Sequence, residues 1–65
     1  MKITVNGTVQ DTAAPSLDAL LIELGYGAAK VATAVNESFV PAVLRPEQRL
    51  NDGDRIEIVA PRQGG

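Results

Sequence analysis

The sequence predicts an α+β domain, in which one helix packs on one face of a mixed sheet of four or five strands. Three observations lead to this prediction. Short segments of alternating apolar side chains occur near both ends of the chain, one stretch has helical spacing, and turn-forming residues separate these segments. The chain has 65 residues, which is the size of one small domain.

The start of the chain predicts a β-hairpin. Apolar and polar residues alternate over residues 1–6, as expected of a half-buried strand. The pair Asn6-Gly7 then supplies the positive φ angles of a tight turn. Residues 8–12 follow as the returning strand, and we expect Val9 on its core face.

One helix is expected between Ser16 and Gly25. The Ser16 hydroxyl oxygen is a suitable N-cap, because it can accept a hydrogen bond from a free backbone N–H of the first turn. Gly25 suits the C-terminal end, which needs a residue that tolerates positive φ. The apolar face follows the helical spacing and consists of Leu17, Leu20, Leu21 and Leu24. Such a short helix is unstable alone, so it must pack on the sheet.

Three further strands are expected after the helix. Residues 31–35 are small and favour β-structure, which indicates an inner strand that is crowded or packed on both faces. A short strand at 38–40 ends at Pro41, and residues 55–59 form the last strand. Between these two strands we expect one short helical turn at residues 46–48.

The predicted element order is therefore β-β-α-β-β-β, with a very short fourth strand. A single helix can cover only one face of the sheet. A hairpin, a helical crossover and strands that return beside the first strand also predict a parallel pair within the sheet.

The composition argues against an enzyme. The chain contains no Cys and no His, so it has no thiol nucleophile, no Ser–His pair and no zinc site of the usual kind. No side chain titrates near neutral pH without a large pKa shift when His is absent. We therefore expect a protein that is not an enzyme and binds no metal.

Nucleic-acid binding and membrane insertion are also not expected. The net charge is −2, and the six basic residues form no cluster of the kind that nucleic acids require. No apolar run approaches the ~20 residues of a membrane span. The chain begins with a strand pattern instead of a signal peptide, which favours the cytoplasm as its location.

The last five residues differ from the rest of the chain. Residues 61–65 contain no apolar side chain that could anchor them, and two glycines end the segment. We therefore expect a domain over residues 1–60 and a flexible tail over 61–65. Fully extended, a tail of this length would reach roughly 17 Å beyond the domain.

Taken together, these residues resemble the ThiS family, the sulfur carriers of thiamine thiazole biosynthesis, which have the ubiquitin-like β-grasp fold. The resemblance extends over essentially the whole chain. Family tails often have small apolar residues before the two glycines, where this chain has other residues. The matching segments are residues 1–7, 16–25, 31–37, 39–41 and 51–58 and the pair Gly64-Gly65.

The resemblance implies a chemistry that takes place at the last residue. In the family, a ubiquitin-activating-like enzyme of the ThiF type uses ATP to adenylate the C-terminal carboxylate, which here is that of Gly65. Sulfur from a donor enzyme then replaces AMP and leaves a thiocarboxylate, which supplies a ThiG-type thiazole synthase. The carrier itself binds no cofactor. The residues expected to thread into the partners' active sites are Pro61, Arg62, Gln63 and Gly64.

Several alternatives remain open at the level of sequence. A sulfur carrier for molybdopterin synthesis, a ubiquitin-like protein modifier and a simple interaction module would have the same fold. Phe39 and Val59 also have two interpretations. We expect both to pack within the domain, and the alternative is that they form a docking surface for a partner.

Overall fold

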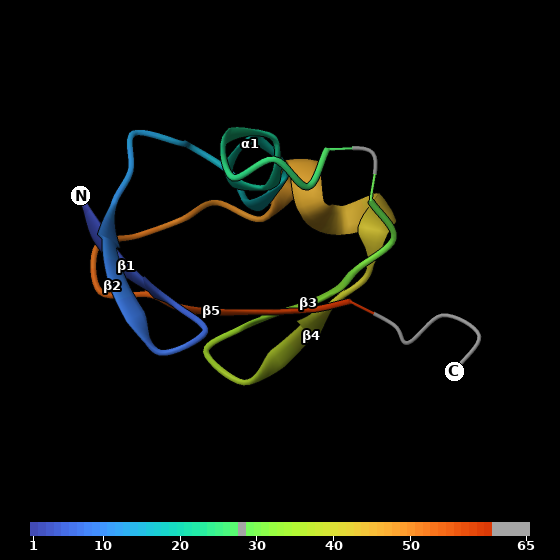
Figure 1. Cartoon of the computed structure of the whole chain (residues 1–65). Coiled ribbons are helices and arrows are strands. Elements are labelled where there is room, and N and C mark those ends of the chain that lie inside the picture. Colours follow the sequence, from blue (N-terminus) through green and yellow to red (C-terminus); the bar gives the residue numbers. More distant parts are fainter. Residues whose placement is uncertain (28, 61–65) are drawn as a thin grey trace.

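The computed structural model has a five-stranded mixed sheet with one α-helix on one face, which confirms the predicted β-grasp architecture (Figure 1). It describes residues 1–27 and 29–60. The helical elements are α1 (Leu17–Glu23) and the 3₁₀ helix η1 (Ala42–Glu47). The strands are β1 (Lys2–Val5), β2 (Thr8–Asp11), β3 (Ala32–Val35), β4 (Ser38–Val40) and β5 (Arg55–Val59).

The last strand lies in the middle of the sheet. The strand order is β2-β1-β5-β3-β4, so β5 separates the two hairpins. It runs parallel to β1 and antiparallel to β3, and the predicted parallel pair is therefore confirmed. Consequently, β5, the last strand before residues 61–65 in the sequence, is a central strand instead of an edge strand.

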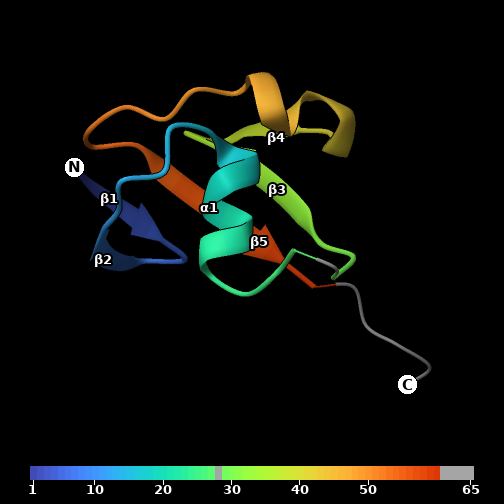
Figure 2. The ribbon, with the colours of Figure 1, turned by 90° about the horizontal axis from the view of Figure 1, so that it is seen from above.

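The core lies between the sheet and α1. Figure 2 shows the helix lying over the middle of the sheet. Leu17 and Leu20 of the helix are fully buried, because the apolar stripe of α1 faces the strands. The strands contribute alternate residues to the same core, as period two requires: Ile3, Val5, Val35, Ile56 and Ile58.

Both predicted ends of α1 are confirmed. The Ser16 hydroxyl oxygen accepts a hydrogen bond from the backbone N–H of Ala19 at 3.2 Å. Gly25 adopts a φ of +91° after the helix, a conformation that glycine adopts without steric cost. The backbone N–H groups of Gly25 and Tyr26 donate to carbonyl groups of the last turn, which satisfies the free helical carbonyls.

The prediction that Val9 faces the core is wrong. Its side chain is 64% exposed. The register pairs Val9 with Thr4, whereas buried Ile3 pairs with Gln10. Directly paired residues share a face, so Val9 lies on the sheet face that α1 does not cover. We call this uncovered side the open face.

Two smaller predictions also need correction. β3 is an inner strand as expected, but it is not packed on both faces: Thr33 is buried, while Ala32 on the open face is exposed. The short helical turn expected at 46–48 begins earlier, because η1 starts directly after Pro41. Within residues 1–27 and 29–60, no helix is long and apolar enough to span a membrane.

Candidate functional site

The end of β5 is the described part of the chain that lies nearest to the predicted reactive segment. Pro61, Arg62, Gln63, Gly64 and Gly65 lie outside the described residues. Strand pairing nevertheless extends close to this segment, since Val59 is paired with Ala32 of β3. The structure therefore defines the position from which the predicted tail would begin.

Asn6 connects the β1–β2 turn to the end of β5. Its carboxamide oxygen accepts a hydrogen bond from the Ile58 backbone N–H at 2.8 Å. Its carboxamide nitrogen donates to the Ile58 backbone carbonyl at 3.0 Å. The Asn6 backbone N–H also donates to the Ile56 carbonyl at 2.9 Å. These bonds extend the β1–β5 ladder beyond Val5, the last residue of β1.

Asn36 makes similar contacts at the other end of β5. Its carboxamide oxygen accepts a hydrogen bond from the Arg55 backbone N–H at 2.9 Å, and its nitrogen donates to an Asp54 carboxylate oxygen at 3.0 Å. Asp54 is buried and also accepts from the Asn51 backbone N–H at 2.8 Å. Both ends of β5 are thus held by asparagine side chains from hairpin turns.

Phe39 and Val59 are not packed in the core, so the prediction of ordinary packing is wrong. Phe39 is 69% exposed and Val59 is 62% exposed. The cause is the register, which pairs Phe39 with Ala34 and Val59 with Ala32 on the open face. We call these four residues the open-face patch. Its alanines let the two larger side chains present apolar surface on either side of β3.

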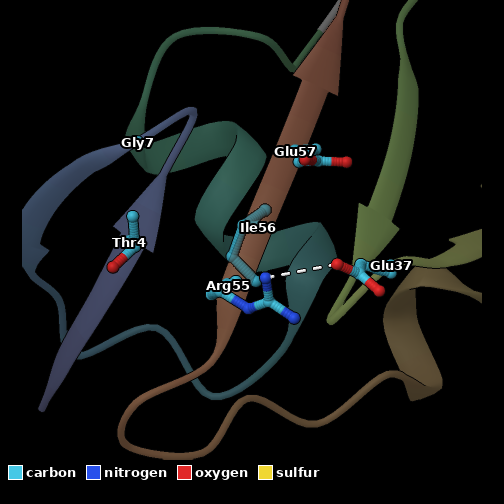
Figure 3. Close-up of a pocket in the computed structure, with 6 residues that line it drawn as sticks. All are labelled: Thr4, Gly7, Glu37, Arg55, Ile56 and Glu57. Atoms are coloured by element: carbon cyan, nitrogen blue, oxygen red, sulfur yellow. Dashed lines mark hydrogen bonds and ion pairs between the residues drawn. The ribbon is translucent and has the colours of Figure 1, made fainter.

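An open depression of about 190 Å³ lies beside this patch. Figure 3 shows Arg55 on β5 reaching toward Glu37 in the turn before β4, and their side chains form an ion pair at 3.4 Å. Both side chains are exposed, so the pair adds little stability. The depression is lined by Thr4, Gly7, Glu37, Arg55, Ile56 and Glu57.

The lining of the depression combines two carboxylates, one guanidinium and one hydroxyl group. No group of three potential ligands that could hold a metal ion occurs in residues 1–27 and 29–60.

Sequence reasoning missed two features of this region. It identified Asn6 only as a turn residue and assigned no partner to Asn36, although both side chains bind β5. It also missed Arg45 of η1, which donates to the Thr33 hydroxyl at 3.0 Å and to the Val31 carbonyl. The sequence shows that an asparagine occupies a turn, but the residue that its side chain binds can be identified only from the folded sheet.

Comparisons with known proteins agree with this architecture. The model of the ThiS family matches residues 3–65. A sulfur carrier protein ThiS from Thermus thermophilus is 33% identical over 63 residues, which cover 97% of this chain and 98% of that protein. The crystal structure of a thiamine biosynthesis protein (ThiS) from Geobacter metallireducens has a TM-score of 0.81, with 29% identity and complete coverage of both chains.

A larger relative also contains a segment similar to this chain. A thiazole synthase from Paramagnetospirillum magneticum is 41% identical over 66 residues. The match covers 100% of this chain but only 20% of the synthase. The chain thus spans a fifth of the length of that relative.

Proposed function

This chain belongs to the ThiS family, and from that membership we propose that it carries sulfur for the thiazole moiety of thiamine and is not itself an enzyme. The main support is the family match, which continues through both glycines at residues 64 and 65. The relative from Thermus thermophilus, which has nearly the same length, is a protein named sulfur carrier protein ThiS. The absence of Cys and His supports the non-enzymatic role.

The proposed reactive group is the carboxylate of Gly65. A carboxylate is a poor electrophile, so a ThiF-type enzyme first joins it to AMP at the expense of ATP. Sulfide supplied by a donor enzyme then attacks the acyl carbon, and AMP leaves with the electrons of the broken carbon–oxygen bond. The product is a thiocarboxylate on Gly65. Because this chain has no thiol of its own, its sulfur cannot be held as a persulfide on a side chain.

Residues 61–64 are proposed to thread into the active sites of the partner enzymes. Gly64 has no Cβ, which permits a narrow channel and backbone angles closed to other residues. ATP and the catalytic side chains belong to the partners, so the carrier needs no cofactor of its own. We also propose a cytoplasmic location, because the reaction consumes ATP.

The open-face patch is the proposed docking surface of the domain. Phe39 and Val59 expose apolar surface, and Val59 is the last residue of β5. A partner that covered this patch would therefore also lie near the start of the tail. An exposed apolar surface of this kind is typical of protein recognition.

A ThiG-type thiazole synthase is the proposed acceptor of the sulfur. This assignment is supported by the thiazole synthase of Paramagnetospirillum magneticum, in which a segment similar to this chain belongs to the synthase polypeptide. That relationship favours thiazole formation over molybdopterin synthesis. If the chain were only an interaction module, its similarity to a segment of a thiazole synthase would have no explanation.

The intact mass of the protein tests the proposal directly. The chain is incubated with ATP, a cognate ThiF-type enzyme and a sulfur source. We expect a mass increase equal to the exchange of one oxygen atom for sulfur, located at Gly65 by fragmentation. A variant that lacks Gly65 is the matched control and should not change in mass.

Two results would contradict this proposal. One is the absence of adenylate and sulfur in the full chain when the same enzyme modifies another carrier. The other is an equal mass change in the variant without Gly65. If sulfur is transferred, incubation with thiazole synthase or with a molybdopterin precursor distinguishes the two acceptor pathways.

A further inference from the structure

We infer that Asn6 is a positioning residue for the carrier, because its side chain holds the end of β5 in the orientation from which the C-terminal segment departs. This inference rests on the proposed function. Asn6 lies 52 residues before Ile58 in the sequence. Its carboxamide nevertheless binds both backbone polar groups of Ile58, at 2.8 and 3.0 Å.

The Asn6 carboxamide takes the place of a peptide group of a neighbouring strand. It offers one acceptor and one donor, which is what a β-ladder partner provides. β1 ends at Val5, so no backbone of that strand lies opposite Ile58. If the Asn6 side chain were removed, the Ile58 N–H and C=O groups would lose their hydrogen bonds on the β1 side of the sheet.

The consequence for the end of β5 follows from its pairing. On one side, Val59 pairs with Ala32 of β3. On the other side, the Asn6 carboxamide is the last contact along β5 that extends the β1 ladder. With both contacts present, the end of the strand is held from two sides. Removal of Asn6 leaves only the β3 side and allows β5 to fray from Ile58 onward.

Fraying would matter because the proposed reaction requires one carboxylate to enter two different active sites. A strand end with a fixed direction limits the conformations that the following residues must search. Preorganisation of this kind raises the fraction of docked complexes in which the reacting group is correctly placed. Asn6 would thus act through the backbone of β5, without contact with the reacting atoms.

The backbone conformation at Asn6 permits a clean test. Asn6 has a φ of +48°, and glycine adopts such angles without strain. Asn6→Gly therefore removes the carboxamide but keeps the turn. Asn36→Gly is the matched control, because Asn36 has a φ of +50° and binds the opposite end of β5 at Arg55. Both variants lose one carboxamide and add one glycine to the unfolded chain.

The experiment compares the two variants with the wild-type chain in two measurements. Amide relaxation by NMR reports the order of Val59 and Ala60 in the free protein. Single-turnover adenylation with excess ThiF-type enzyme and ATP reports how rapidly the docked carboxylate reacts. We expect Asn6→Gly to lower the order at both amides and to slow adenylation about fivefold to tenfold. Asn36→Gly should remain within about twofold of wild type.

A second variant keeps the test decisive if Asn6→Gly does not fold. Asn6→Asp retains an acceptor for the Ile58 N–H but replaces the donor with an oxygen that faces the Ile58 carbonyl. We expect the same loss of order and a similar slowing. If neither Asn6 variant folds while Asn36→Gly does, Asn6 is a folding residue and the inference is overturned.

The other outcomes are equally decisive. Equal slowing of Asn6→Gly and Asn36→Gly would indicate general destabilisation and would overturn the inference. Unchanged adenylation in Asn6→Gly would do the same, even with reduced order at Val59. A wild-type chain that is never adenylated would overturn the proposed function together with this inference, whereas wild-type activity without a difference between variants would overturn this inference alone.

Discussion

Replacement of Phe39 with threonine should weaken docking on the partner enzymes without unfolding the domain. The ring is 69% exposed, so little core packing is lost with it. Threonine retains the preference of this position for β-structure. Ile22→Thr is the matched control, because Ile22 is 64% exposed on α1, which covers the opposite face of the sheet.

The structure sets an upper limit on the expected effect. A phenylalanine side chain offers roughly 200 Å² of surface, of which about 140 Å² is accessible at this exposure. At about 25 cal/mol per Å², complete coverage by a partner would stabilise the complex by about 3.5 kcal/mol. Threonine keeps part of this contact and coverage is seldom complete, so we expect a loss of about 2 kcal/mol. This corresponds to a KM for the carrier that is about 30-fold higher.

Two assays separate docking from folding. Steady-state adenylation by the ThiF-type enzyme, measured over a range of carrier concentrations, gives the KM for each variant. Urea unfolding gives the free energy of unfolding, which should change by less than about 1 kcal/mol in Phe39→Thr. Ile22→Thr should leave the KM within about twofold of the wild-type value.

Particular results would refute the assignment of the open-face patch. An unchanged KM for Phe39→Thr would show that this surface does not contact the activating enzyme. An equal rise for Ile22→Thr would indicate a non-specific effect of lost apolar surface. A loss of several kcal/mol in stability would instead mean that Phe39 supports the fold, contrary to its exposure.

Two further predictions concern the body of the domain. Thr33→Val removes the hydroxyl group that accepts a hydrogen bond from Arg45, and we expect the free energy of unfolding to fall by about 1–2 kcal/mol in urea titrations. Thr33→Ser retains this hydrogen bond and is the control. A valine variant as stable as the wild-type chain would show that the hydrogen bond does not contribute to stability. The second prediction concerns the ion pair between Lys2 and Asp11. The pKa of the Asp11 carboxyl is lowered from 3.8, mainly by the hydrogen bond that Lys2 donates at 3.0 Å and secondly by the positive charge of Lys2. Because this folded-state pKa is lowered, the pair stabilises the fold above the ordinary pKa and loses its effect as the pH falls through the folded pKa. Lys2→Met should raise the Asp11 pKa toward 3.8 in an NMR titration, and an unchanged value would contradict this cause.

The sequence predicted those parts of the fold that depend on local signals. Ser16 and Gly25 mark the ends of α1 because capping depends on residues within one turn of the helix end. β4 and β5 have the predicted bounds, since turn residues interrupt the chain on both sides of each strand. The parallel β1–β5 pair followed from the order of the elements.

The failures occurred where the face of a strand depends on its neighbours. Val9 is apolar and alternates with polar residues, yet its pairing with Thr4 places it on the open face. Phe39 was expected to pack within the domain because large apolar residues are usually buried. A single helix covers only one face, and the sequence alone does not specify which residues of an edge strand face it.

Asn6 and Asn36 are turn residues whose side chains also bind a strand that is distant in the sequence. Asn6 was recognised through its preference for positive φ, which is a property of the residue and its turn. That same conformation directs its short side chain toward β5, where it meets the backbone of Ile58. An asparagine is therefore suited both to closing the hairpin and to binding the last strand, whereas glycine would satisfy only the turn. The variants at Asn6 and Asn36 separate these two roles, because glycine preserves the turn at either position and removes the side-chain contacts, which at Asn36 include the hydrogen bond to Asp54 as well as the contact with β5.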